Sequence, residues 1–164
     1  MKVGIIMGSK SDLETMKKAS SVLDEFKNPY EMIIASAHRT PEAVKSIVER
    51  LEEEGAIAFI AGAGAAAHLP GVVASFTTLP VIGIPLNATA LKGIDSLLAI
   101  VQMPSGMPVA TMAVDGAKNA ALFVVQIGAA FNKNIKAQYK AYRQDMADKV
   151  LADNDALQAS FQGE

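Results

Sequence analysis

The sequence predicts an α/β domain built on a parallel, doubly wound sheet. Two observations predict this fold. Apolar runs of strand length alternate with longer segments whose apolar residues recur at helical spacing. Most of the short runs are continuously apolar, as expected for strands that are covered on both faces. A chain in which strands and helices alternate in this way folds into a parallel sheet with right-handed crossovers.

The expected elements follow in chain order. Apolar runs predict strands at 3–7, 32–35, 57–61, 81–84 and 109–114. Helical spacing predicts helices at 11–26, 41–54, 69–76 and 91–101. Ser11 and Glu14 form a capping box for the first of these helices. Thr40 is the expected N-cap of the second, with Pro41 in its first helical position.

The C-terminal third predicts helices that need a partner. Residues 119–131 are apolar almost all the way round, and a small monomer covers only one face of such a helix. A long amphipathic helix follows, whose apolar stripe is Ile135, Tyr139, Tyr142, Met146 and Val150. We expect a homo-oligomer in which the helix at 132–158 packs on a neighbouring subunit. The alternative is a helix that folds back on its own sheet. The tail from residue 153 is expected to fray.

Composition excludes several classes of protein. A length of 164 residues fits one domain, 1–164, and 51% hydrophobic residues suffice for a core. The net charge of -2 and the absence of a basic stripe argue against a nucleic-acid partner. The chain has no Cys, which excludes disulfides and thiolate chemistry. No signal peptide and no run long enough to span a bilayer are visible, so we expect a cytoplasmic protein without a membrane partner.

Unusual segments follow each of the first three expected strands, at 8–12, 36–41 and 62–71. In a parallel sheet these segments meet at the carboxyl edge, where open α/β folds bind ligands. The chain has two histidines, and each lies in one of these segments. The sequence therefore places its candidate chemistry at this edge.

The first segment resembles an anion site. Gly8 allows a turn, and Ser9, Lys10 and Ser11 offer donors at a helix N-terminus. The Asp12 carboxylate suits neighbouring sugar hydroxyls. Alternatively, Ser11 only caps the helix and Asp12 only complements its dipole.

The second segment combines a phosphate clamp with an acid/base group. Arg39 lies beside a helix N-terminus together with the hydroxyls of Ser36 and Thr40, an arrangement that suits phosphate. A salt bridge is the alternative role for Arg39. His38 is the best candidate for general acid/base catalysis because imidazole titrates near neutral pH.

The third segment reads G-x-G-x-x-A over 62–67, a weak dinucleotide signal, since it follows the third strand and no acidic residue ends the next one. Its small residues better suit the close approach of a small planar ligand. His68 either contacts that ligand or caps the next helix. Two histidines without Cys make a poor metal site, so no metal is expected. The carboxylates of Glu49, Glu52, Glu53 and Glu54 are interpreted as a solvated helix face.

Four motifs carry a family resemblance: GSKSD at 8–12, SAHRTP at 36–41, AGAGAAAHLPG at 61–71 and DSLLAIVQMP at 95–104. Together they resemble the bacterial N5-carboxyaminoimidazole ribonucleotide mutases of purine biosynthesis, over about residues 1–150. The resemblance implies a flavodoxin-like three-layer α/β/α sandwich with an extra C-terminal helix, assembled as an octamer. It also implies a reaction without metal or cofactor, which converts N5-carboxyaminoimidazole ribonucleotide into its 4-carboxy isomer.

The resemblance also implies roles for matching residues. The expected ribose-phosphate ligands are Ser9, Ser11, Asp12, Ser36 and Arg39, with Asp12 on the ribose hydroxyls. Gly64, His68 and Leu69 would line a pocket for the carboxylate or carbon dioxide, and His38 would be the acid/base. Carbon dioxide would leave the nitrogen, stay trapped in this pocket and be captured by ring carbon C4. Its proximity to C4 would favour the capture.

The sequence departs from the family in three places. Ala65 stands where Gly is expected, and we expect an ordinary backbone geometry there. The stretch 113–119 is about two residues short, and Ala99 replaces a more usual Ser. Two other functions stay open: direct carboxylation of aminoimidazole ribonucleotide by carbon dioxide, and a non-catalytic, flavodoxin-like nucleotide-binding module.

Overall fold

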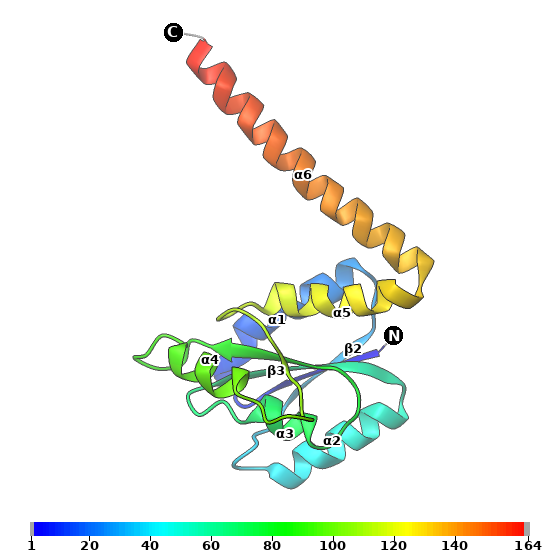
Figure 1. Cartoon of the computed structure of the whole chain (residues 1–164), viewed down its shortest axis with the longest axis vertical. Coiled ribbons are helices and arrows are strands. Elements are labelled where there is room, and N and C mark those ends of the chain that lie inside the picture. Colours follow the sequence, from blue (N-terminus) through cyan, green and yellow to red (C-terminus); the bar gives the residue numbers. More distant parts are fainter. Residues whose placement is uncertain (1, 163–164) are drawn as a thin grey trace. The chain divides into compact units, whose positions relative to one another are not determined.

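A five-stranded parallel sheet organises the chain in a computed structural model that describes residues 2–162 (Figure 1). The strands are β1 (Lys2–Met7), β2 (Tyr30–Ile34), β3 (Ala56–Gly64), β4 (Val81–Leu86) and β5 (Ala110–Thr111). Their order is β2-β1-β3-β4-β5, and every neighbouring pair is parallel. This is the flavodoxin-like order of doubly wound sheets. The predicted fold class is therefore confirmed.

Helices cover both faces of the sheet. They are the 3-10 helix η1 (Lys10–Asp12), α1 (Leu13–Glu25), α2 (Pro41–Glu53), α3 (Leu69–Ala74), α4 (Ile94–Val101), α5 (Ala117–Phe131) and α6 (Lys133–Gln162). Helix α1 and the first part of α5 lie over one face, and α2 and α3 lie over the other (Figure 1). Helix α4 shares the face of α3, because a Cβ at Gly83 of β4 would lie 2.6 Å from Ile100 and 3.2 Å from Pro70.

The core consists of the strand side chains and the inner helix faces. Phe59 of β3 is fully buried, as are Val48 and Leu51 of α2. Burial of each such side chain contributes about 1.5–3 kcal/mol. The continuous apolar runs β3 and β4 are buried along almost their whole length, which is the pattern expected for central parallel strands. This core fixes the carboxyl edge of the sheet, from which the loops of the site emerge.

Some element bounds differ from expectation. Strands β3 and β4 are longer than predicted, and β5 has two residues instead of six. Helix α4 begins at Ile94 rather than at residue 91. Lys92 and Gly93 have φ of 52° and 87°, so the chain before α4 is left-handed and cannot be helical.

The predicted capping box is wrong. Ser11 lies inside η1, and the N-cap of α1 is Asp12, whose side chain makes no cap hydrogen bond. The hydroxyl of Ser9 accepts from the Ser11 backbone N–H instead, at 3.3 Å. Glu14 accepts from Lys17 Nζ at 2.8 Å. The predicted start of α2 is confirmed, with Thr40 at the N-cap position and Pro41 at the first helical position.

The chain divides into two compact units, Met1–Val124 and Val125–Glu164. In the second unit, the Asn132 carboxamide caps α6 by accepting from the backbone N–H of Asn134 (2.9 Å) and of Ile135 (3.2 Å). Helix α6 then runs unbroken to Gln162, so the fraying expected from residue 153 is wrong. None of the helices within residues 2–162 combines the length and apolarity of a membrane span. The single domain and the packing of the last helix on a neighbour stay predictions.

Candidate active site

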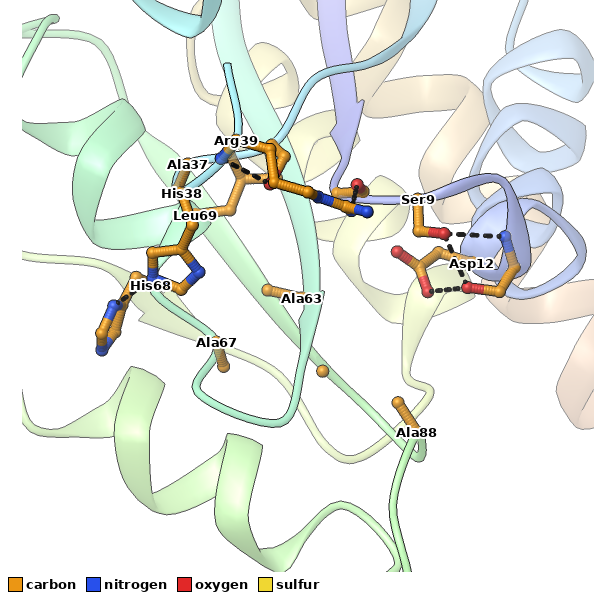
Figure 2. A pocket seen from close by; sticks show the side chains of 14 residues that line it. Ser9, Asp12, Ala37, His38, Arg39, Ala63, Ala67, His68, Leu69 and Ala88 are labelled. Carbon is orange, nitrogen blue, oxygen red and sulfur yellow. Dashed lines mark hydrogen bonds between the residues drawn. The ribbon is translucent and has the colours of Figure 1, made fainter. Parts of the chain in front are cut away.

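The segments that follow β1, β2 and β3 meet in one cavity of about 350 Å³ at the carboxyl edge of the sheet (Figure 2). All nine site residues named from the sequence line it: Ser9, Ser11, Asp12, Ser36, His38, Arg39, Gly64, His68 and Leu69. Lys10, which the sequence also offered as a donor, is exposed and does not line the cavity. The side chains that the sequence places at the carboxyl edge of the sheet therefore lie together in this cavity.

The first segment forms a small network of hydroxyls and a carboxylate. The Ser11 hydroxyl lies 3.0 Å from the Ser9 hydroxyl and 3.2 Å from Asp12 Oδ1, so it can donate to either (Figure 2). Burial raises the pKa of the Asp12 carboxyl, and the hydrogen bonds from Ser11 and the Ser9 backbone and the charge of Arg39 offset this only in part. A half-buried carboxylate without a cation in contact is suited to accept hydrogen bonds from a ligand.

The second segment is a closed turn that carries Arg39. The Ser36 N–H donates to the Thr40 hydroxyl at 2.9 Å, and the Thr40 N–H donates back to the Ser36 carbonyl at 2.9 Å. Thr40 is therefore used in the turn, and its side chain does not cap α2. Arg39 Nη2 donates to the Gly8 carbonyl at 2.7 Å, and Nε donates to the Ser36 hydroxyl at 3.3 Å. Within residues 2–162 Arg39 forms no ion pair with a carboxylate, so its charge is free to meet an anionic ligand.

The third segment departs from its expected geometry. Ala65 has φ of 53° and Ala67 has φ of 50°, both in the left-handed region. The expectation of an ordinary backbone at Ala65 is therefore wrong. The cause is the tight turn after β3, in which the Ala67 N–H donates to the Gly64 carbonyl at 3.0 Å. A left-handed alanine is strained by about 1–2 kcal/mol, and it persists here between the fixed ends of β3 and α3.

Gly64 is small because another loop passes close to it. A Cβ at Gly64 would lie 2.4 Å from the Cβ of Ala88, which follows β4. Leu69, the first residue of α3, is buried and closes the cavity with an apolar wall. The walls near Ala63 and Ala67 consist of methyl groups (Figure 2). This part of the cavity suits a small ligand with little hydrogen-bonding demand.

The two histidines touch each other. His38 Nε2 and His68 Nδ1 lie 2.6 Å apart, and the rings meet edge to face with centroids 4.7 Å apart. His68 occupies the N-cap position of α3, but its side chain makes no cap hydrogen bond. Of the two roles left open for His68, the ring therefore does not serve as a helix cap. Within residues 2–162 no three His, Asp or Glu side chains gather as a possible set of metal ligands.

Sequence reasoning missed the fourth loop. Ala88 lines the cavity, and a smaller pocket of about 180 Å³ beside Asp12 includes Asn87 and Asp115. Asp115 Oδ1 accepts from the Asn87 N–H at 3.1 Å, and the Asp115 N–H donates to the Pro85 carbonyl at 2.8 Å. Asp115 thus braces the loop that carries Ala88. The topological rule applied to the end of the fourth strand would have found this loop.

A flavodoxin-like sheet whose carboxyl edge brings two histidines, an arginine and a carboxylate into one cavity defines a class of protein, an α/β enzyme domain with its site at the strand ends. Comparison with known proteins identifies the family. The sequence matches the AIR carboxylase family over residues 2–149, and the chain belongs to this family.

Several relatives are similar over nearly their whole length. The N5-carboxyaminoimidazole ribonucleotide mutase of Pyrococcus horikoshii is 57% identical over 148 residues, which are 90% of this chain and 84% of the relative. The enzyme of the same name from Bacillus subtilis is 51% identical over 157 residues, 94% of this chain and 97% of the relative. The crystal structure of Treponema denticola PurE superposes with a TM-score of 0.88 at 32% identity, over 95% of this chain and 98% of that one. The family indicated by the four motifs is confirmed.

Proposed function

We propose that this protein is an isomerase of purine biosynthesis that converts N5-carboxyaminoimidazole ribonucleotide into 4-carboxyaminoimidazole ribonucleotide. The observation that carries the proposal is the meeting of His38, Arg39 and Asp12 in one cavity. Membership of the family and relatives that carry this mutase name support the choice of reaction.

The polar half of the cavity suits the ribose phosphate. Arg39 presents a guanidinium that no carboxylate neutralises among the described residues, and Ser9 and Ser36 add hydroxyls beside it. Charged hydrogen bonds to phosphate are about twice as strong as neutral ones. Asp12 lies beside this group and would accept hydrogen bonds from the ribose hydroxyls. We propose that Ser9, Ser11, Asp12, Ser36 and Arg39 bind the substrate in this way.

The apolar half of the cavity suits carbon dioxide. Gly64, Leu69 and the flanking alanine methyl groups offer walls without charge, with His68 at their edge. In the proposed reaction the bond between the exocyclic nitrogen and the carboxyl carbon breaks, and that nitrogen takes a proton. The trapped carbon dioxide then bonds to ring carbon C4, and His38 removes the C4 proton. Retention of carbon dioxide beside C4 replaces a bimolecular encounter by an intramolecular step.

Two further parts of the proposal concern the state of the protein. We propose a homo-oligomer, with eight subunits as the number implied by the family resemblance, in the cytoplasm. The exposed apolar side chains of α6, which include Met146, Val150 and Leu151, support an assembly that covers them. No cofactor is part of the proposed reaction.

The test is reversible isomerisation. Purified protein incubated with the 4-carboxy isomer should establish an equilibrium with the N5-carboxy isomer, followed by ultraviolet absorbance. The reaction should proceed without added bicarbonate. Absence of any conversion by correctly folded protein would contradict the proposal and favour a non-catalytic nucleotide-binding module.

A second candidate is direct carboxylation of aminoimidazole ribonucleotide. Its support is that the phosphoribosylaminoimidazole carboxylase of Schizosaccharomyces pombe is 49% identical over 156 residues, although these are only 28% of that protein. The two candidates differ in their substrates. A direct carboxylase would form product from aminoimidazole ribonucleotide at a rate proportional to dissolved carbon dioxide, whereas a mutase would use the carbamate substrate without it.

A further inference from the structure

The contact between the two imidazoles restricts where their protons can be. His38 Nε2 and His68 Nδ1 lie 2.6 Å apart, which is hydrogen-bond distance. A neutral imidazole has one N–H and one lone pair, and an imidazolium has two N–H groups. Two N–H groups cannot face each other at 2.6 Å, and neither can two lone pairs. One proton therefore lies between the rings, and the pair in contact carries at most one positive charge.

The remaining nitrogens point to different places. His38 Nδ1 is on the side of its ring away from His68, toward the cavity (Figure 2). His68 also lines a second pocket of about 320 Å³ between α3 and α4, whose walls include Val72, Ile100 and Met103. One end of the pair thus faces the proposed substrate, and the other end lies at the border of a different pocket.

We propose that His68 is a positioning residue that shares the proton of His38, so that the two rings work as a single acid/base unit. The proposal rests on the proposed mutase reaction. When His38 Nε2–H donates to His68 Nδ1, His38 Nδ1 is held as a lone pair that faces the cavity. His68 thereby selects the tautomer of His38 that can accept a proton from the substrate.

The histidine pair returns to its starting protonation state after one turnover. The cycle begins with the singly charged pair, which has an N–H at His38 Nδ1, one proton between the rings and an N–H at His68 Nε2. His38 Nδ1 gives its proton to the exocyclic nitrogen as the nitrogen–carboxyl bond breaks and carbon dioxide leaves. The neutral pair then takes the proton from C4 after the new carbon–carbon bond forms. The positive charge is shared by two rings each time it is present.

Few other charges surround the pair. Asp12, from η1, and Arg39, beside His38, are the other charged residues that line the cavity. The guanidinium of Arg39 is turned to the Gly8 carbonyl. The residues from α3 and α4 that line the second pocket are uncharged. Within residues 2–162, His68 is thus the hydrogen-bond partner of the His38 ring.

Histidine labelling tests the shared proton without any substrate. Because the chain has two histidines, ring ¹⁵N spectra of the intact protein contain signals from those two rings only. We expect the ¹⁵N shifts to show one N–H shared by His38 Nε2 and His68 Nδ1, with His38 Nδ1 as a lone pair when the pair is neutral. In His68→Leu, which offers His38 no acceptor, His38 should populate both neutral tautomers. The exposed α2 variant Lys45→Gln should leave both ring spectra unchanged.

Two outcomes of the spectra decide the physical claim. A shared N–H signal that disappears in His68→Leu supports the shared proton. Mixed tautomers of both rings in the wild type, with the His38 signals unchanged in His68→Leu, would overturn it. Both side chains are exposed in the chain, so these variants should fold as the wild type does.

Turnover tests the role in the reaction. The amide of His68→Asn retains a hydrogen-bond acceptor near Nδ1 but cannot take up charge, and His68→Leu has neither property. We expect kcat to fall about 10-fold in the first and about 10²-fold in the second, a share of the 10²–10⁴-fold typical of general acid–base catalysis. KM should stay within a few-fold of wild type, and the pH profile of kcat should change in both. Equal kcat and equal pH profiles in all three proteins would overturn the role. A protein without any isomerase activity would instead overturn the proposed function, while the spectra still decide the shared proton.

Discussion

Arg39 joins two loops as well as facing the cavity. Its guanidinium donates to the carbonyl of Gly8, the residue after β1, while its own loop follows β2. The guanidinium is therefore held in place before any ligand binds. Its backbone N–H and Nε both donate to the Ser36 hydroxyl, which limits the freedom of the side chain further. A preorganised cation loses less entropy when it binds phosphate.

The first prediction concerns His38→Asn. The variant should fold and bind substrate nearly as wild type, because the imidazole is exposed and is hydrogen-bonded to another exposed side chain, His68. Activity should fall by about 10²–10⁴-fold, since an amide cannot exchange a proton near neutral pH. Circular dichroism, calorimetric binding and the isomerisation assay measure the three quantities. Near-normal turnover in a folded variant would assign the proton transfer to another group.

Arg39→Ala should weaken binding of the phosphorylated substrate. The loss of a charged hydrogen-bond partner is expected to cost about 1.5–3 kcal/mol in binding free energy. Calorimetry with the phosphorylated substrate and with its dephosphorylated form separates the charge effect from loop positioning. The dephosphorylated form should bind wild type poorly and be almost insensitive to the variant. Equal affinity of wild type for both forms would mean that this cavity does not bind phosphate.

Asp12→Asn should weaken substrate binding and slightly raise the stability of the fold. Burial raises the pKa of Asp12, so the folded chain binds that proton more tightly than the unfolded chain. Its stabilising effect is complete below the ordinary value of 3.8 and is lost as the pH rises through the folded-state pKa. At neutral pH the ionised carboxylate therefore destabilises the folded chain slightly. Replacement by Asn should raise the free energy of unfolding by ~0.5 kcal/mol or less. Urea unfolding at pH 7 and pH 3.5 measures this gain, which should vanish at the lower pH, while substrate affinity falls at least about tenfold.

At the level of elements, the turn between β3 and α3 stores strain. Ala65→Gly should relieve the left-handed alanine, about 1–2 kcal/mol, against an entropic loss of about 0.5–1 kcal/mol. We expect a net gain of up to about 1 kcal/mol in the free energy of unfolding, measured in urea. Ala66→Gly is the matched control, because Ala66 is exposed and does not have a positive φ. The control should lose stability, and a loss of equal size in both variants would contradict the strain.

The ends of β1, β2 and α2 are joined by a cluster of charges. Arg50 Nη2 lies 2.7 Å from Glu31 Oε1, and Lys2 pairs with both Glu31 and Glu54. Arg50 and then Lys2 lower the pKa of Glu31 to about 2. The sequence predicts a solvated face for Glu52 and Glu54, but Glu54 belongs to this cluster and Glu52 accepts from the Thr77 hydroxyl at 2.7 Å. Helical spacing gives the face of a residue, not which strand end lies opposite it.

The elements that the sequence predicted well are those with a strong local signal. The buried runs of β3 and β4 and the Thr40-Pro41 start of α2 could be read directly. The capping box failed because Ser11 had a competing local partner, the Ser9 hydroxyl. The geometry of Ala65 failed because the ends of the flanking strand and helix impose it, against the preference of alanine.

The candidate site was predictable in its membership but not in its contacts. Parallel topology brought three loops together, and their polar residues could be named from the sequence. The contact between His38 and His68 joins residues 30 positions apart, and no spacing rule relates them. Ala88 was missed because its side chain has no chemistry to draw attention to it. Its position depends on the brace that Asp115 forms to Asn87.

For the whole molecule, apolar side chains remain uncovered in the single chain. Along α4, exposed Leu91, Ile94, Leu98 and Val101 recur at spacings of three and four residues, on or just before the helix. Along α6, the stripe named from the sequence begins with half-buried Ile135 and ends with exposed Met146 and Val150. Scattered apolar residues are ordinary on protein surfaces, but stripes at helical period are typical of interfaces.

The last prediction is that removal of α6 disrupts the assembly. A chain that ends at Phe131 should give aggregates or small, inactive species, because α5 is then left without the helix that we expect to reach a neighbouring subunit. Light scattering coupled to gel filtration should report a large closed oligomer for the intact chain, with eight subunits expected from the family resemblance. In the intact chain, Met146→Gln should weaken this oligomer, and Asp148→Asn, also exposed on α6, should leave it unchanged. An active monomer at micromolar concentration would contradict this interpretation of the C-terminal third. It would leave the cavity intact, since every residue that lines the cavity lies between Gly8 and Ala88.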